Sequence, residues 1–380
     1  MPHRFLLLSA GMGEGHDAVA HELALRLRAR GHIVTVRDVL TMLPARIGPA
    51  LRASYRATVR HAPGLYGAVY AGFLAPGSGP RPGSAPLARL AEGALLRTVG
   101  QWRPDAVVST FHLAAQLTGR LRARGALRVP SAVVLVDFAA HRGWLHAGND
   151  THLCVSAAGA RAVQAATGRP AAVTGPVVPE RFRAPVDVDG RWARLLARHT
   201  DGPGRRPVVL VSTGAWGVGS GLLETARQLA DGGLLPVMLC GHDEQLRRTA
   251  ARLPGLLPLG WVEDLPGLMA ASDVLLDNAA GQTAVQALAA GLPVVAHRPL
   301  TGHGAQGVHE MARSGCCRHV AGPGEPTRTA RALAAPGPAR TRQIAAGRAA
   351  FRSDAALAVE NLLVRGRPGS ADRGRLSGTG

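Results

Sequence analysis

The feature of this sequence that most limits its fold is a repeated alternation of short apolar runs with longer helical stretches. Phe5–Ser9 is an apolar run without polar alternation, and a glycine-rich turn and a helical stretch over about 17–30 follow it. Val19, Leu23 and Leu27 recur at the spacing of one helix face. Strands of this kind, separated by helices, predict a parallel sheet that helices cover on both faces.

The alternation occurs in two series, and a chain of 380 residues is long enough for two domains of about 100–200 residues each. Ligands of such sheets bind beyond the carboxyl ends of the strands. We therefore predict two Rossmann-like, doubly wound α/β domains that face a cleft. The expected parts are an N-terminal domain over 1–180, a linker region over 181–206, a C-terminal domain over 207–345, a C-terminal helix over 346–365 and a disordered tail over 366–380.

The charge balance is strongly basic, with a formal net charge of +19 that comes from arginine because the sequence contains no lysine. Codon usage alone explains such a bias, but the charge also favours anionic partners such as nucleotide diphosphates or lipid head groups. No nucleic-acid-binding motif is present, so we expect no nucleic-acid partner. The four cysteines form no C-x-x-C pair, which predicts no zinc site and a reducing, cytoplasmic location. Without an apolar stretch of about 18–20 residues, any membrane contact is expected at the inner surface of the cell membrane.

The first candidate site is the turn from Gly11 to His16, between a predicted strand and a predicted helix. Its glycines, including Gly13 and Gly15, allow close backbone approach, and a helix N-terminus favours negative charge. Their spacing differs from that of the dinucleotide-binding fingerprint. A histidine at such a position is a candidate general base, and the alternative is a capping or packing role for His16.

Two further N-terminal segments carry candidate residues. Asp137 and His141 follow an apolar strand and are expected at its carboxyl edge, where Asp137 orients a hydroxyl or an imidazole, or caps a turn. The segment from Thr41 to about Pro86 interrupts the alternation with prolines and holds all three tyrosines, including Tyr66. It is expected to lie on a membrane or line an acceptor groove, or to be an irregular helical insertion packed on its own domain.

The second series has two candidate phosphate-binding turns. Ser212–Ser220 follows a strand, and its backbone N–H groups and hydroxyls can hold a diphosphate, although the lysine of a P-loop is missing. The stretch from Asn278 opens a helix at Gly281, which places Thr283 near a phosphate and Gln286 within reach of a ribose hydroxyl. The alternative for each residue alone is a capping or surface role.

These residues together resemble known families. The N-terminal half resembles the monogalactosyldiacylglycerol synthases and processive diacylglycerol glucosyltransferases, through 11–16, Asp38, 137–141 and Trp144. The C-terminal half resembles the C-terminal domain of glycosyltransferase family 28. The residues that carry this second likeness are Cys240-Gly241, Gly260-Trp261-Val262, Asp273 and the stretch 281–295.

The resemblance covers roughly residues 4–320 and implies a GT-B fold, with the acceptor on the N-terminal domain and a UDP-sugar on the C-terminal one. It implies an inverting hexosyltransferase that uses no metal and no cofactor and acts on a lipid or another hydrophobic acceptor. The implied catalytic residues are His16, Asp137 and His141. The implied acceptor-binding residues are Gly13, Gly15, Tyr66 and Trp144. The implied donor-binding residues are Thr213, Gly214, Gly217, Trp261, Val262, Gly281, Gln282, Thr283, Gln286 and His303.

The sequence departs from the family pattern in the donor half. Gln286 replaces a glutamate, and the run 278–283 lacks a lysine and one glycine. His303 and Gly304 stand where glutamine and glutamate are usual. These changes keep two alternatives open, a non-catalytic GT-B binding protein and a nucleotide-sugar epimerase.

Overall fold

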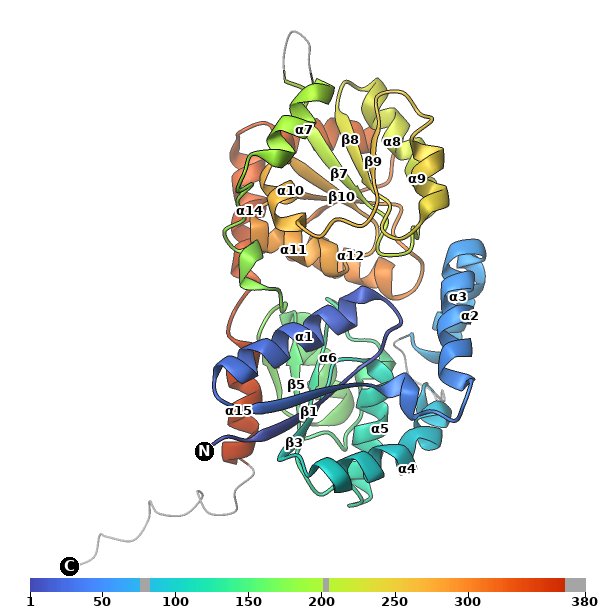
Figure 1. Ribbon diagram of the computed structural model, residues 1–380, viewed down its shortest axis with the longest axis vertical. Helices are drawn as coiled ribbons and strands as arrows, with labels where there is room; N and C mark the ends of the chain where they lie inside the picture. The colour runs from blue at the N-terminus through green and yellow to red at the C-terminus, as the bar shows by residue number, and fades with distance from the viewer. Residues whose placement is uncertain (76–82, 201–204, 366–380) are drawn as a thin grey trace, which may run out of the picture.

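The computed structural model of this chain describes residues 1–75, 83–200 and 205–365. The tail predicted at 366–380 lies outside the described residues. Two α/β domains are stacked along the long axis of the molecule, as the two series of strands predicted (Figure 1).

The N-terminal sheet has six parallel strands in the order β2-β1-β3-β4-β5-β6. Its central strands are buried on both faces, which explains why they carry no polar alternation. The strands are β1 Arg4–Ser9, β2 Ile33–Asp38, β3 Ala106–Ser109, β4 Ser131–Val134, β5 Thr151–Cys154 and β6 Ala171–Val173.

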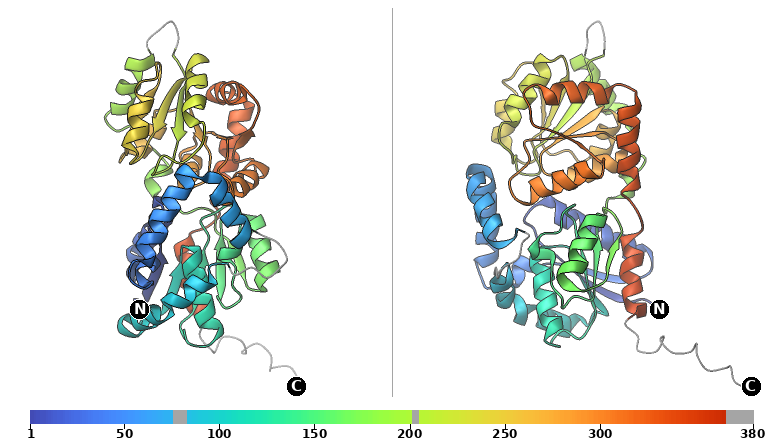
Figure 2. Two further views of the ribbon diagram at one scale, coloured as in Figure 1. Left: turned by 90° about the vertical axis from the view of Figure 1, so that its right-hand side faces the viewer. Right: turned by 180° about the vertical axis from the view of Figure 1, so that it is seen from behind.

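Helices cover both faces of this sheet, and two more helices stand beside it (Figures 1 and 2). The helices are α1 Glu14–Ala29, α2 Ile47–His61, α3 Pro63–Phe73, α4 Ala85–Trp102, α5 His112–Ala123 and α6 Ala157–Thr167, with short 3-10 turns η1 Val39–Met42, η2 Arg142–Trp144 and η3 Glu180–Phe182. The segment that interrupts the alternation after β2 is therefore helical where it is described.

The C-terminal sheet also has six parallel strands, in the order β12-β11-β10-β7-β8-β9. Its strands are β7 Val208–Ser212, β8 Leu235–Leu239, β9 Leu257–Leu259, β10 Val274–Asp277, β11 Val294–His297 and β12 Arg318–Val320. Its helices are α7 Arg191–Thr200, α8 Leu222–Asp231, α9 Glu244–Ala250, α10 Leu265–Ala270, α11 Gln282–Ala290, α12 His303–Arg313, α13 Glu325–Ala334 and α14 Pro338–Ala349.

Each sheet has one point where the strand order reverses, and ligands of open α/β sheets bind beside such a point. In the N-terminal sheet it lies between β1 and β3, so the turns that open α1 and α5 are neighbours. In the C-terminal sheet it lies between β7 and β10, which brings together the turns that open α8 and α11.

The connections between the domains differ from the predicted boundaries. The expected linker contains η3 and α7, and Trp192 and Leu196 bury one face of α7 in the C-terminal core. The expected helix over 346–365 is the end of α14 and a separate helix, α15 Ala355–Arg365. α15 returns to the N-terminal domain, where Val359 and Leu362 pack in a core with Phe5 (Figure 2).

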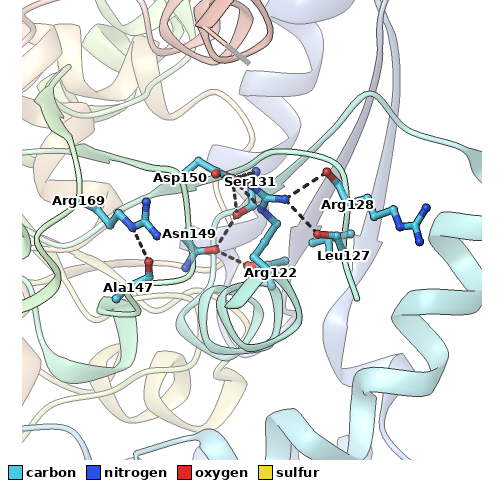
Figure 3. A network of polar contacts seen from close by, with 9 residues as sticks. Arg122, Leu127, Arg128, Ser131, Ala147, Asn149, Asp150 and Arg169 are labelled. Atoms are coloured by element: carbon cyan, nitrogen blue, oxygen red, sulfur yellow. Dashed lines mark hydrogen bonds and ion pairs between the residues drawn. The ribbon is translucent and has the colours of Figure 1, made fainter. Parts of the chain in front are cut away.

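A polar network fixes α5 to the edges of β4 and β5 (Figure 3). The Arg122 guanidinium donates to both carboxylate oxygens of Asp150, at 2.9 and 2.5 Å, and to the carbonyl oxygens of Leu127 and Arg128. The same carboxylate accepts the backbone N–H of Ser131 at 2.8 Å. Such paired, charged hydrogen bonds hold a helix in a defined place. They therefore also help to fix the other end of α5, which begins at His112 after β3.

Candidate active site

The two domains meet at the N-terminal ends of α1 and α11, which face each other across the boundary in Figure 1. A Cβ atom added at Gly15 would lie 3.5 Å from Cβ of Gln282. The Gln282 amide donates to the carbonyl of Val177 at 3.2 Å, on the segment that leaves the N-terminal domain. Gln282, which the resemblance assigns to the donor, thus contacts the other domain.

His16 lies in the first turn of α1, directly after the glycine-rich turn. Its Nδ1 is 3.0 Å from the carbonyl oxygen of Thr110, which follows β3. Because a carbonyl can only accept, Nδ1 carries the proton and Nε2 keeps its lone pair. Burial lowers the pKa of His16, while the nearby Asp137 charge opposes this change. The side chain is therefore neutral at neutral pH, with an unprotonated Nε2.

Asp137 and His141 form a pair whose geometry assigns each a different task. The backbone N–H of Gly143 donates to Nδ1 of His141 at 3.1 Å, so the ring proton lies on Nε2, 3.4 Å from Oδ2 of Asp137. The indole N–H of Trp144 donates to the same carboxylate oxygen at 2.7 Å. Both His141 nitrogens are thus engaged within the protein, and His141 orients Asp137.

The Asp137 carboxylate is the charged centre of the site. Burial opposes its ionisation, but the hydrogen bond from His141 and the neighbouring imidazoles of His303 and His16 hold the pKa of Asp137 far below its usual range. Trp144 is completely buried. Its contribution to the site therefore runs through Asp137 rather than through contact with a bound acceptor.

Two more imidazoles surround this carboxylate. His112 opens α5, and its ring centroid lies 5.4 Å from that of His141. His303 opens α12 in the C-terminal domain, with its ring centroid 6.5 Å from that of His141. Burial lowers the pKa of both side chains, and that of His112 most strongly. The site therefore combines neutral imidazoles from both domains around one carboxylate.

Tyr70 of α3 links the domains at the same place. Its hydroxyl donates to Oε1 of Gln306 on α12 at 2.6 Å, and its ring lies against Gly302. Gly302 has a φ of +86°, and a Cβ there would approach the Tyr70 ring to 2.8 Å, so both the backbone and the contact require glycine. Burial raises the pKa of Tyr70 well above its usual value, so its hydroxyl stays protonated.

A cavity of about 380 Å³ opens beside these residues, between the loop after β4 and α12. Half of its lining residues are alanines, and the Tyr70-bonded Gln306 lies among the larger polar ones. The lining residues are Ala139, Ala140, Ala305, Gln306, His309 and Glu310. The exposed wall of this space is mostly apolar, although His309 and Glu310 add polar groups, and Ala140 directly precedes His141 in the chain.

The turn between β7 and α8 has a backbone that depends on glycine. Gly214, Gly217 and Gly219 have φ values of +66°, +67° and +139°, which other residues rarely adopt. A Cβ at Gly217 would lie 2.5 Å from the carboxylate of Asp243. Thr213 is completely buried and donates its hydroxyl to the carbonyl of Leu239 at 2.7 Å, so it supports the loop from behind.

The turn between β10 and α11 presents a free helix start. Asp277 is buried and accepts the N–H groups of Ala279 and Ala280, at 2.9 and 2.7 Å, which fixes the turn. Ala280 has a φ of +51°, which is a strained value for alanine. Within the described residues, the half-buried Thr283 and Gln286 have no hydrogen-bond partner in the protein and are available to a ligand.

An aromatic row borders the β7–α8 turn. The rings of His242 and Trp261 are stacked at 4.4 Å with an interplanar angle of 10°, and Trp261 is half exposed. Trp216 lies 5.2 Å from His242, and the guanidinium of Arg56 from α2 lies 3.6 Å over the Trp216 ring. A flat, partly exposed aromatic face of this kind suits a nucleotide base. Val262 packs against the core beneath it.

Two arginines of α2, in the segment for which membrane contact is one of the expectations, are half-buried and paired within the protein. Arg52 forms an ion pair with Asp38 at 2.6 Å, and Arg56 stacks on Trp216. The side chains of Arg60 and Tyr66 lie outside the described part of the structure, and Gly13 has open space around its Cβ position.

Sequence reasoning missed His112, Gln306 and His242, and from the segment with the three tyrosines it named Tyr66 and not Tyr70. For His112 a signal was present, because it comes three residues after the end of a buried apolar strand, at a place that corresponds to that of His16 after β1. The other three come close to the site only through the packing of α3, α12 and the β8–α9 turn. Among the described residues, no group of three or more His, Cys, Asp or Glu side chains is arranged to hold a metal ion.

Solved structures of other proteins share the two-domain architecture of this chain. MurG from Acinetobacter baumannii is 14% identical, with 96% of this chain and 100% of that chain covered and a TM-score of 0.57. Anabaena Alr3699/HepE in complex with UDP-glucose is 16% identical, with 96% and 98% covered and a TM-score of 0.54. The chain has the GT-B fold. The sequence resemblance predicted this GT-B fold, and the structure confirms it.

Sequence comparison confirms that the N-terminal half of this chain resembles the monogalactosyldiacylglycerol synthases and the processive diacylglycerol glucosyltransferases. Residues 16–178 match the family model of monogalactosyldiacylglycerol (MGDG) synthase, which is less than half of the chain. The processive diacylglycerol β-glucosyltransferases of Bacillus licheniformis and Bacillus subtilis are each 24% identical over 212 residues. These matches cover 54% of this chain and 54% of each relative, so the chain spans about half the length of the curated relatives it matches.

Proposed function

We propose that this protein is an inverting glycosyltransferase that transfers a hexosyl group from a UDP-sugar to a hydroxyl of a diacylglycerol-like lipid at an anionic membrane surface. The observation that carries the proposal is the meeting of a histidine base with a nucleotide-type loop at one domain boundary. Gly15, next to His16, faces Gln282, next to Thr283. A base on one domain and a phosphate-binding helix start on the other are the two groups that a single displacement needs.

In the proposed reaction, Nε2 of His16 takes the proton of the acceptor hydroxyl while its oxygen bonds to the anomeric carbon of the donor. The bond from that carbon to the UDP oxygen breaks at the same time, which inverts the anomeric centre. Asp137 stabilises the imidazolium that forms, since its charge favours protonated His16. The leaving diphosphate gains negative charge, which the N-terminus of α11, Thr283 and the β7–α8 turn are placed to meet.

The choice of a lipid as acceptor and of a UDP-sugar as donor is supported by similar proteins as well as by the geometry of the site. The matched relatives are named for diacylglycerol, and one neighbour is named for its UDP-glucose complex. The apolar cavity beside Asp137 fits a lipid, and the His242–Trp261 stack fits a base. In the described residues, no helix has the length and apolar character to cross a membrane. We place the reaction at the cytoplasmic membrane face.

The first test is a thermal-shift titration with UDP, other nucleoside diphosphates and a panel of UDP-sugars. A ligand at about 100 times its Kd adds about 2.7 kcal/mol to stability, which gives a clear rise in Tm. The UDP-sugar with the largest shift is then supplied with dioctanoylglycerol, and glycolipid formation and the anomeric configuration are measured. Binding without transfer to any acceptor would favour a non-catalytic binding protein, which Gln286 and His303 in the donor half also suggest. Conversion of the UDP-sugar without an acceptor would point to an epimerase.

A further inference from the structure

The outer face of α3 is an unusual surface for a helix of this protein. Leu65, Val69 and Phe73 are 58%, 47% and 45% exposed, and their spacing of four residues places them on one side of the helix. From Ala62 to Pro80 the sequence contains no charged residue and no histidine. The three side chains therefore form an exposed apolar stripe, which we call the α3 stripe.

Elsewhere in the described chain, exposed apolar residues on helices are isolated, and the exposed Val186 and Val188 alternate with Asp187 and Asp189 in a loop. Leu25, Leu90 and Leu357 are 59%, 48% and 44% exposed, but each lies on a different helix that also carries charged side chains. Single exposed leucines are common on protein surfaces, whereas a contiguous apolar stripe marks a contact surface. The three leucines provide matched controls for the α3 stripe.

The opposite face of α3 reaches the candidate active site. Tyr70 is 3% exposed and bonds to Gln306. A Cβ at Gly67 would lie 3.2 Å from the side chain of Thr301, in the loop that leads to His303. In Figure 1, α2 and α3 stand beside both domains at the domain boundary. One helix therefore contacts the site with one face and leaves an apolar stripe on the other.

We infer that the α3 stripe is the surface by which the protein lies on the lipid bilayer that holds its acceptor. The inference rests on the proposed function, because the bilayer is where a diacylglycerol-like acceptor resides. A helix of this length with an apolar face lies in the interfacial plane of a bilayer and does not cross it. An acceptor that leaves the bilayer at α3 arrives beside Tyr70 and the cavity next to Asp137.

Charge favours a bilayer over a protein partner as the occupant. The uncharged segment is flanked in the sequence by Arg60 and Arg81, and the whole chain carries +19. Basic residues next to an apolar helix are attracted by the negative surface of an anionic leaflet. An uncharged stripe also offers no ion pair that would select one protein partner.

The first experiment measures partition of the full chain onto vesicles of phosphatidylglycerol and phosphatidylcholine. The test variant carries Leu65→Ser, Val69→Ser and Phe73→Ser, and the control carries Leu25→Ser, Leu90→Ser and Leu357→Ser. We expect the partition coefficient to fall by about tenfold or more in the test variant and to stay within about twofold in the control. Equal loss in both variants, or no vesicle binding by the unmodified protein, overturns the inference.

A second measurement keeps the inference testable if the triple variant folds poorly. All four native cysteines are buried, so a cysteine introduced at the surface can be labelled selectively. An environment-sensitive fluorophore at Val69→Cys is expected to shift to shorter wavelength when vesicles are added, and the same label at Leu25→Cys is expected not to shift. An unchanged spectrum at position 69 overturns the inference.

Failure of the inference and failure of the proposed function give different results. Transfer from the best UDP-sugar to dioctanoylglycerol dispersed in detergent needs no bilayer, so the α3 stripe variant should keep that activity. If the protein binds vesicles through α3 but transfers no sugar to any acceptor, the membrane-contact surface is supported and the proposed glycosyltransferase activity is refuted. If the α3 stripe variant instead dissociates a dimer in sedimentation experiments and still binds vesicles, the stripe is a contact between two copies, which overturns the inference.

Discussion

At the scale of single residues, hydrogen-bond partners assign different roles to neighbouring histidines. His16 donates Nδ1–H to a carbonyl, whereas His141 receives a backbone N–H at Nδ1. The first therefore keeps Nε2 as a base, and the second directs Nε2–H to Asp137. The sequence shows two histidines of equal character, and only their partners separate a base from an orienting group.

Replacing the base should remove catalysis and spare the donor. His16→Ala is expected to lower kcat by about 10²–10⁴ with nearly unchanged UDP affinity, because the imidazole acts on the acceptor proton. Steady-state rates and a UDP titration measure both quantities. An unchanged kcat would exclude His16 from the mechanism.

The pH profile should report the charge of Asp137. A neutral His16 is the active form, so kcat/KM is expected to rise with pH and to level off below the ordinary histidine pKa of 6.5, since burial lowers the pKa of His16. The Asp137 charge raises that pKa, so Asp137→Asn should move the acid limb to lower pH as well as reduce the plateau. A limb that stays in place in this variant would show that another group titrates.

At the scale of secondary structure elements, helices position the site through their first residues. α1, α5, α11 and α12 place His16, His112, Thr283 and His303 within their first turns. A helix that shifts along its axis would displace such a residue directly. The contacts that fix each helix are therefore as important as the site residues.

The polar network that fixes α5 through Arg122 and Asp150 should contribute measurably to the free energy of unfolding. Asp150→Asn removes the charged partner of Arg122 and is expected to lower the free energy of unfolding by about 1–3 kcal/mol in urea denaturation. Glu224→Gln is the control, since the Arg227–Glu224 pair is solvent-exposed and such pairs contribute little. If both changes lower the free energy of unfolding by a similar amount, the polar network around Arg122 stabilises the protein no more than a surface ion pair does.

The start of α11 offers a gain-of-affinity test. Gln286→Glu is expected to tighten UDP binding by about 3- to 10-fold, because a carboxylate accepts a hydroxyl more strongly than an amide does. Calorimetry with UDP and with its 2′- and 3′-deoxy forms measures this effect. If Gln286 contacts the ribose, the gain disappears with at least one deoxy form. A gain that persists with both would place Gln286 elsewhere.

At the scale of the whole molecule, the chain crosses between its domains more than once. α15 completes the core of the N-terminal domain although it follows the entire C-terminal domain. α3 and Tyr70 contact α12 from the other side of the cleft. The relative position of the two halves of the site therefore depends on contacts between segments far apart in the sequence.

Removing α15 should destabilise the distant domain. A chain that ends after Ser353 loses the buried side chains of Ala355, Ala356, Val359 and Leu362, on the order of 5 kcal/mol of apolar burial. Limited proteolysis should then cut first within 1–178, while UDP binding to the C-terminal domain persists. A chain that ends after Arg365 is the control. Equal protease resistance of the two chains would contradict this role.

Much of the fold was predictable because burial on both faces gives a parallel strand a continuous apolar run. β1, β4, β7 and β10 follow this rule, and the resemblance placed His16, Asp137 and Thr283 after three of them. Strand boundaries and the helical character of α7 were less clear, since Trp192 and Leu196 lie in a segment rich in Pro, Asp and Gly. The single helix expected over 346–365 was wrong because the residues around Ser353 leave one domain for the other.

The sequence alone determined the two sheets, the glycine-rich turns and the position of His16, because each depends on residues that are neighbours in the chain. The tertiary structure decided which imidazole keeps a free nitrogen, that Trp144 and Arg56 face inward, and that Tyr70 meets Gln306. These properties depend on hydrogen bonds and packing between segments separated by up to 236 residues. No local pattern encodes such contacts, since they arise only when the domains are packed together.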